Sequence, residues 1–272
     1  MLWSSGFTFV AMGLPHAQPV TFLALRYLIV VALLGAAAVV LRPPLPRDRA
    51  TWLHLAVVGL LLQAAYFGLL YLALEHVAPA VAALVVCLQP VLVALLAPLT
   101  VGEHVPLARW AGLGLGLLGA AAVILVRADD GGTDAAGIAL AVASLLAITA
   151  ATLYESRFGT ELHPVTGNLV QCAVALAATG AVALVAEDLR VDWTGELVIS
   201  LTYLVLGNSI VSITLLLAMV RRGTASQVSA LFFLVPPLAA LIAWAILGES
   251  LPALAWVGMV VAAIGVAVAT RR

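Results

Sequence analysis

The chain has 272 residues, of which 64% are hydrophobic and only 9% are charged, and its formal net charge is −1. Ordinary soluble domains are about 45 to 50% apolar and about 25% charged, so a water-soluble fold could not bury this much apolar surface. A net charge close to zero gives no indication of a nucleic-acid partner. The composition therefore predicts an all-α protein that lies in a lipid bilayer.

Ten apolar stretches follow one another along the chain. A bilayer core of about 30 Å requires about 20 residues of helix, at about 1.5 Å per residue. The stretches without Asp, Glu, Lys or Arg are 51–74, 78–100, 135–154, 164–186, 197–219, 223–248 and 250–270. The others are 1–14, 19–41, which contains Arg26, and 107–126, which contains Arg109 near its start. Because the connections are short, we expect one polytopic membrane domain with ten transmembrane helices.

The N-terminal stretch differs from the others in length. Residues 1–14 fall about five residues short of a full membrane crossing, so we expect either a translation start further upstream or a helix that begins at the membrane surface. Met1, Leu2 and Trp3 lead directly into apolar sequence without a basic leader, which does not match a cleavable signal peptide.

The arginines predict the orientation of the helices, because cytoplasmic loops carry an excess of basic residues. With ten helices and a cytoplasmic N-terminus, only Arg127 and Arg190 face outward, together with the acidic loops at 129–134 and 187–196. We therefore expect both termini to be cytoplasmic and the protein to lie in a bacterial inner membrane. The arginines on the cytoplasmic side would be Arg42, Arg47, Arg49, Arg109, Arg157, Arg221, Arg222, Arg271 and Arg272.

An internal repeat divides the chain into two halves. A shift of 146 residues aligns 78–123 with 224–269 without a gap, and Pro19-Val20-Thr21 matches Pro164-Val165-Thr166 at nearly the same shift. Shared Leu and Ala carry little weight in apolar helices, whereas a shared pattern of Pro, Gly-Glu, Pro, Trp and Gly favours duplication. The informative pairs are Pro90 with Pro236, Gly102-Glu103 with Gly248-Glu249, Pro106 with Pro252, Trp110 with Trp256, Gly112 with Gly258, and Gly119 with Gly265.

The repeat predicts two halves of five helices, 1–126 and 135–272. Five is an odd number, so the second half must cross the membrane in the opposite sense to the first. Inverted-topology repeats of this kind are typical of secondary transporters, whose substrate site lies near the middle of the membrane between the halves.

The chain resembles the EamA-type proteins of the drug/metabolite transporter superfamily. The resemblance rests on 2–7 (LWSSGF), on 22–27 (FLALRY), on the block from Tyr71-Leu72-Ala73-Leu74 through Pro79 and Pro90 to Gly102-Glu103, and on its second copy from Ala225 through Pro236 to Gly248-Glu249. It implies ten helices, cytoplasmic termini and the export or exchange of metabolites such as amino acids. Among the branches of the superfamily, the exporters of aromatic and neutral amino acids are the nearest likeness.

Three prolines and one arginine lie well inside the predicted helices. Pro90 and the pair Pro236-Pro237 each lie about twelve residues before a Gly-Glu turn, so each is expected to bend its helix at mid-membrane. The freed carbonyls favour a central cavity, although kinks that serve packing alone are the alternative. Arg26 is either a cationic anchor for a substrate carboxylate or phosphate, or a structural residue shared by the resembled family.

Polar and aromatic residues on two predicted helices are candidates for the cavity lining. Gln63, Tyr66, Phe67 and Tyr71 fall within an arc of about 140° at about 100° per residue, and Asn168, Gln171 and Cys172 cluster similarly. Hydrogen bonds between helices are the alternative role for each of them. The remaining candidates are Trp3, Phe7, Gln89, Gln227 and Trp244.

We expect alternating access around a fixed site near the middle of the membrane, in a monomer or weak dimer that carries a small-molecule solute. No Asp or Glu lies inside a predicted helix, so a facilitator or exchanger is favoured over a proton-coupled carrier. The spacing of His, Cys, Asp and Glu predicts no metal, cofactor or enzyme site. A membrane-embedded enzyme and a nontransporting scaffold remain the alternatives.

Overall fold

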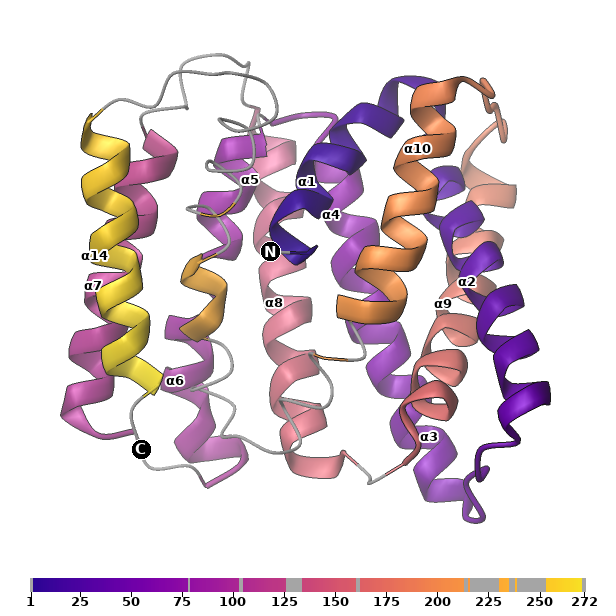
Figure 1. The fold of residues 1–272 in the computed structure, drawn as a ribbon, viewed down its shortest axis with the longest axis horizontal. Helices are drawn as coiled ribbons and strands as arrows, with labels where there is room; N and C mark the ends of the chain where they lie inside the picture. The colour runs from indigo at the N-terminus through magenta and orange to yellow at the C-terminus, as the bar shows by residue number, and fades with distance from the viewer. Residues whose placement is uncertain are drawn as a thin grey trace.

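The computed structural model describes residues 2–77, 79–102, 105–125, 134–159, 162–212, 230–234 and 253–270, together with Leu215 and Leu238 (Figure 1). Among these residues the regular elements are helices, and the β-contact is an isolated antiparallel bridge between Ala17 and Val191. The prediction of an all-α protein is therefore confirmed for this part of the chain. Helical stretches long and apolar enough to cross a membrane are Pro19–Leu41, Arg49–Ala73, Ala135–Phe158, Pro164–Ala186 and Gly195–Ser212.

The described elements follow the predicted apolar stretches closely. Those before residue 126 are α1 (Leu2–Gly13), the 3₁₀ turn η1 (Leu14–His16), α2 (Pro19–Leu41), α3 (Arg49–Val58), the π-helical segment η2 (Gly59–Tyr66), α4 (Phe67–Ala73), α5 (Pro79–Val86), α6 (Gln89–Thr100) and α7 (Leu107–Leu125). Those after residue 134 are α8 (Ala135–Phe158), α9 (Pro164–Ala186), α10 (Gly195–Tyr203), the π-helical segment η4 (Leu204–Ser212), the 3₁₀ segment η5 (Leu231–Leu234) and α14 (Ala253–Thr270).

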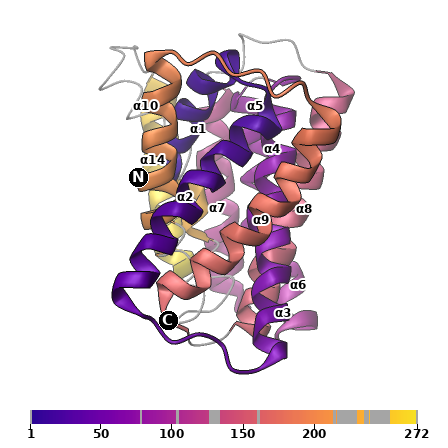
Figure 2. The same ribbon diagram turned by 90° about the vertical axis from the view of Figure 1, so that its right-hand side faces the viewer.

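Two pairs of described helices run in opposite directions. In Figure 1 the colour gradient shows α2 descending and α9 ascending, while α7 ascends and α14 descends. The pair α7 and α14 lies at one edge of the molecule, and the pair α2 and α9 lies at the other, where Figure 2 shows both helices tilted. We call residues 145 or 146 positions apart equivalent.

Several of the helix contacts come in equivalent pairs. α1 packs against α10 and η4, and the corresponding contact joins α8 to α3 and η2. In the same way, α9 packs against η2, whereas α2 packs against η4. The two halves therefore interlock, since the first helix of each half contacts the third helix of the other.

Both third helices contain a π-helical segment at an equivalent position. Gly59–Tyr66 and Leu204–Ser212 each directly follow a helix that begins with a capped N-terminus. Asp48 accepts a hydrogen bond from the Thr51 amide at 2.7 Å, and the hydroxyl of Thr194 accepts one from the Leu197 amide at 3.3 Å. π-Helical turns are rare and frequently mark functional sites, because they widen the helix and redirect its side chains.

The fourth helix of the first half is broken rather than merely bent. α5 ends at Val86, a turn covers Cys87 and Leu88, and α6 begins at Gln89. Pro90 therefore lies in the first turn of α6, where its missing amide hydrogen is not needed. Pro236 and Pro237, which were expected to bend the equivalent helix, lie outside the described residues.

A carboxylate closes the N-terminus of α2. Glu187 accepts hydrogen bonds from the Val20 amide at 2.9 Å, the Thr21 amide at 2.7 Å and the Thr21 hydroxyl at 2.6 Å. The first amides of a helix have no partner within the helix and carry a partial positive charge, so an anion there is stabilising. Glu187 therefore holds the first turn of α2, the helix that carries Arg26, in place.

Candidate functional site

Arg26 lies at the centre of a buried cluster that joins three helices. Its guanidinium is fully buried, with Nε donating to Ser209 Oγ at 2.7 Å and Nη1 donating to the Tyr71 hydroxyl at 2.9 Å. The ring of Phe67 lies 4.6 Å from Cζ, which is within the range of a cation–π contact. Arg26 on α2 thus connects α4 and η4.

The positive charge of Arg26 has no carboxylate partner among the described residues. The ion pairs in that part of the chain lie near helix ends, and they join His16 with Glu196, His76 with Asp134, and Arg190 with Asp188. Nη2 of Arg26 also has no hydrogen-bond acceptor within the described residues. A buried cation without a counter-ion is costly and attracts any anionic group that can approach it.

A second set of hydrogen bonds surrounds this cluster. The Tyr27 hydroxyl donates to the Gln63 backbone oxygen at 2.6 Å, and Asn168 Nδ2 donates to the Ser209 backbone oxygen at 2.8 Å. Neither amide atom of the buried Gln171 side chain has a partner among the described residues, and the same holds for Gln63 Nε2. The core between α2, η2, α9 and η4 therefore holds more polar groups than the described residues supply with hydrogen-bond partners.

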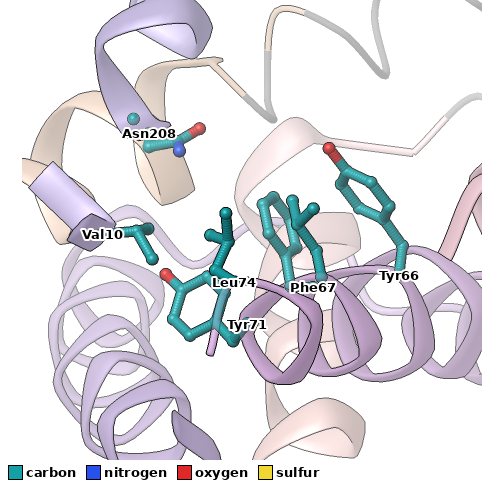
Figure 3. Close-up of a pocket in the computed structure, with 8 residues that line it drawn as sticks. Val10, Tyr66, Phe67, Tyr71, Leu74 and Asn208 are labelled. Atoms are coloured by element: carbon teal, nitrogen blue, oxygen red, sulfur yellow. The ribbon is translucent and has the colours of Figure 1, made fainter. Parts of the chain in front are cut away.

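A pocket opens beside the arginine cluster. The empty space within it, part of which is open to the outside, is about 260 Å³. Figure 3 shows Asn208 on one side of the pocket, with Phe67, Tyr71 and Leu74 of the α4 region on the other. Arg26 does not line the pocket, although its partner Tyr71 does. The lining residues are Gly6, Val10, Tyr66, Phe67, Leu70, Tyr71, Leu74 and Asn208.

The candidates predicted from sequence fall into three groups. Arg26, Gln63, Tyr66, Phe67, Tyr71, Asn168 and Gln171 are all buried in this region. Gln89 lies elsewhere, since its Nε2 donates to Thr152 Oγ1 of α8 at 3.2 Å. The remaining candidates lie outside the described part of the molecule, namely the side chains of Trp3 and Phe7 and the residues Gln227 and Trp244.

Sequence reasoning missed Tyr27, Asn208 and Ser209, and it used the wrong helix geometry for Gln63 and Tyr66. An angle of about 100° per residue holds for an α-helix, but η2 is π-helical and turns less at each residue. The repeat itself held the missing signal for one residue. Asn208 is the equivalent of Gln63 at a shift of 145, just as Gln171 is the equivalent of Arg26.

Several known proteins are similar to this chain. A WAT1-related chloroplastic protein of Arabidopsis thaliana is 26% identical over 97% of the chain, which spans 66% of that protein's length. The uncharacterized transporter YvbV of Bacillus subtilis is 25% identical over 87% of the chain and 77% of its own length. A probable terminal-alkyne amino-acid exporter of Streptantibioticus cattleyicolor is 28% identical over 99% of the chain and 90% of its own length.

A solved crystal structure shares the fold. It superposes with a TM-score of 0.81 at 21% identity and covers 99% of this chain and 93% of its own. The profile of the EamA-like transporter family matches the chain twice, over residues 1–125 and 135–271. These matches cover nearly the whole sequence, and they agree with the apolar helices of membrane-spanning length. The chain is a multi-pass membrane transporter that belongs to the EamA-like transporter family.

Proposed function

We propose that this protein is a secondary transporter that exports or exchanges neutral and aromatic amino acids across a bacterial inner membrane by alternating access. The observation that carries the proposal is the buried guanidinium of Arg26, which lacks a carboxylate partner among the described residues and lies beside a largely apolar pocket. A solute with a carboxylate and an apolar body complements that combination. The amino-acid exporter among the relatives supports the same class of solute.

The proposed architecture is ten transmembrane helices in two inverted repeats, 1–126 and 135–272. Three observations support it: the opposite directions of equivalent helices, the paired contacts between the halves, and the π-helical segments at equivalent positions. Alternating access follows naturally from such an arrangement, because two similar halves that rock about one site exchange the open side.

The proposed orientation places both termini in the cytoplasm. The connection between α2 and α3 lies at the lower end of Figure 1, together with the C-terminal end of α14. It carries Arg42 and Arg47, and Arg49 is the first residue of α3. Arg157 near the end of α8 lies at the same level as the end of α6, since it donates to the Thr100 backbone oxygen. An excess of arginine at that end supports its assignment to the cytoplasmic side.

We propose solute exchange rather than proton coupling as the driving reaction. The apolar stretches contain no mid-membrane Asp or Glu, and the buried Glu155 lies in the last turn of α8. A carboxylate at one end of a helix is not reached from both sides of the membrane in turn. Uphill export that collapses on addition of a protonophore would refute this part of the proposal.

Other solutes are the alternative, namely nucleosides, sugars, other metabolites or drugs. The structure also offers a second role for Arg26, since both of its hydrogen bonds are made to the protein itself. In that role Arg26 is a structural clamp between α2, α4 and η4, and it never touches the solute.

Counterflow in proteoliposomes tests the proposal. Vesicles that contain the purified protein are loaded with a mixture of unlabelled amino acids, and uptake of each labelled amino acid is measured. Saturable uptake of apolar or aromatic amino acids is expected, with a loss of at least about tenfold in Arg26→Ala because the buried positive charge that attracts the solute carboxylate is removed. Arg190→Ala is the matched control, since this arginine is exposed in the connection between α9 and α10.

Two results would contradict the proposal. No uptake of any amino acid by the wild-type protein would redirect the search to nucleosides and sugars. Full uptake in Arg26→Ala together with a lower unfolding temperature would assign Arg26 to the structural role.

A further inference from the structure

The hydrogen bond between Arg26 and Tyr71 has a defined direction. A guanidinium can only donate, so the Tyr71 oxygen accepts and its own proton remains available. The described residues offer that proton no acceptor, and Tyr71 is a lining residue of the pocket. The pocket therefore contains a hydroxyl donor that is polarised by a buried cation, and such polarisation strengthens its ability to donate.

An acceptor lies across the pocket from this donor. Asn208 is 3% exposed, lines the pocket from η4, and its Oδ1 has no hydrogen-bond partner among the described residues (Figure 3). Its neighbour in the chain, Ser209, accepts from Arg26 Nε. Tyr71 and the 208–209 dipeptide thus connect the pocket to the same guanidinium from two sides.

We propose that Tyr71 and Asn208 contact the solute directly, and that Arg26 is a positioning residue that acts through Tyr71. The Tyr71 hydroxyl donates to the solute carboxylate, and Asn208 Oδ1 accepts from the solute ammonium. This inference rests on the proposed function, because it assigns the two polar groups of an amino acid to two named side chains. It differs from direct anchoring by Arg26, which has no surface in the pocket.

The remaining walls of the pocket suit an apolar side chain. Val10, Leu70 and Leu74 face it from α1 and the α4 region. At the end near Asn208 the pocket leaves room only for a glycine at position 6, since a Cβ added there would lie 2.5 Å from Asn208 Nδ2. Any larger residue at position 6 would therefore displace the amide that is proposed to bind the ammonium group.

Three solutes of one shape separate the two polar contacts. Leucine carries both groups, 4-methylpentanoate lacks the ammonium, and 3-methylbutylamine lacks the carboxylate. The affinity of each is measured by displacement of labelled leucine from the purified protein in detergent. Variants whose affinity for labelled leucine is too low for displacement are titrated directly by calorimetry.

Each variant should lower the affinity for a different pair of solutes. Tyr71→Phe is expected to reduce the affinity for leucine and 4-methylpentanoate about tenfold, because one hydrogen bond to a charged group is lost, and to leave 3-methylbutylamine unchanged. Asn208→Leu should reduce the affinity for leucine and 3-methylbutylamine and leave 4-methylpentanoate unchanged. Tyr203→Phe is the matched control, since it also removes a tyrosine hydroxyl from this end of the bundle but does not line the pocket.

The indirect role of Arg26 has its own readout. If Arg26 acts through Tyr71, then the double variant Arg26→Gln/Tyr71→Phe binds 4-methylpentanoate no more weakly than Arg26→Gln alone. Direct contact between Arg26 and the carboxylate would instead make the two losses add.

The outcomes distinguish this inference from the proposed function. A wild-type protein that binds neither leucine nor any other amino acid would refute both the proposed function and this inference. If the wild-type protein binds leucine, but Tyr71→Phe and Asn208→Leu each lower the affinity for all three solutes equally, only this inference would be refuted.

Discussion

Equivalent helices of the two halves contact each other at both edges of the molecule, and the two contacts differ in kind. The α7–α14 contact is made through glycines, since a Cβ at Gly119 would lie 2.3 Å from the Ala262 amide nitrogen and one at Gly265 would lie 2.2 Å from that of Gly116. The α2–α9 contact borders the polar core, with Arg26 on one helix and Gln171 on the other. One pair is packed backbone to backbone, and the other carries buried polar side chains.

The difference between these two contacts distinguishes the part of the molecule that packs the halves together from the part that contains the candidate site. Gly112 and Gly119 have glycine equivalents at Gly258 and Gly265, so these contact glycines recur in both copies. Arg26 and Gln171 are also equivalent, yet only one is a cation. A single anionic group needs only one cation, and two buried cations close together would repel each other. The halves therefore differ where a solute would bind and agree where they pack.

The largest effect is expected from a side chain placed between α7 and α14. Gly119→Leu should lower the free energy of unfolding by about 3 kcal/mol, because the backbone of α14 lies where the new side chain must go and cannot move aside. Thermal unfolding of the purified protein in detergent measures the change. Gly114→Leu on the same helix is the control, since a Cβ there meets nothing within 4 Å. Equal stability of the two variants would contradict the close approach of these helices.

Moving the cation from α2 to α9 tests the polar pair. Arg26→Gln is expected to reduce amino-acid exchange at least about tenfold, and the added change Gln171→Arg should not restore it. The reason is that Tyr71 and Ser209, which orient Arg26, have Leu216 and Ala64 as their equivalents at a shift of 145. Initial rates of counterflow provide the measurement. Recovery in the double variant would mean that the two positions are interchangeable.

Much of the fold could be predicted from the sequence, because apolar length and charge distribution are direct consequences of the bilayer. The helical class and the family were predicted correctly, and α2 and α9 begin at the matched residues Pro19 and Pro164. The ten crossings and the opposite sense of the halves stay predictions. The π-helical segments had no sequence signal, since the choice between α and π turns depends on packing against other helices rather than on local propensity.

The candidate site was predictable where a residue was conspicuous by itself or belonged to a polar face of one helix, as Gln63, Tyr71 and Gln171 do. Arg26 was conspicuous as a charge inside an apolar helix. Ser209 and Asn208 were not, because small polar residues are common in membrane helices and gain meaning only from a partner across the bundle. Glu187 was interpreted as part of an acidic outer loop, although its carboxylate caps α2 from more than 160 residues away in sequence.

The N-termini of α2 and α9 provide a smaller test of the same comparison. Glu187→Ala should lower the free energy of unfolding by about 1 to 2 kcal/mol, since it removes the carboxylate that caps α2. Thr166, the equivalent of Thr21, donates only to the Pro44 backbone oxygen, so Thr166→Ala should cost about 1 kcal/mol or less. Asp188→Ala is the control for Glu187, because Asp188 is exposed and pairs only with Arg190 in the described structure. A larger loss in Thr166→Ala than in Glu187→Ala would reverse the predicted order.

The smallest effect concerns the caps of α3 and α10, which are acidic in one half and neutral in the other. Hydrogen bonds from the Thr51 amide and hydroxyl lower the pKa of Asp48 below its usual value of 3.8. A carboxylate with a lowered pKa in the folded state contributes stability above its usual pKa and loses that contribution as the pH falls through the folded value. Acid should therefore loosen the first turn of α3, whereas Thr194 at the start of α10 has no proton to gain. The measurement is hydrogen exchange of the Thr51 and Leu197 amides below about pH 4, with each variant compared at equal pH with the wild-type protein. In Asp48→Thr, acid should no longer speed exchange of the Thr51 amide. In Thr194→Asp, acid should begin to speed exchange of the Leu197 amide. An acid response of Thr51 that persists in Asp48→Thr would assign it to another group.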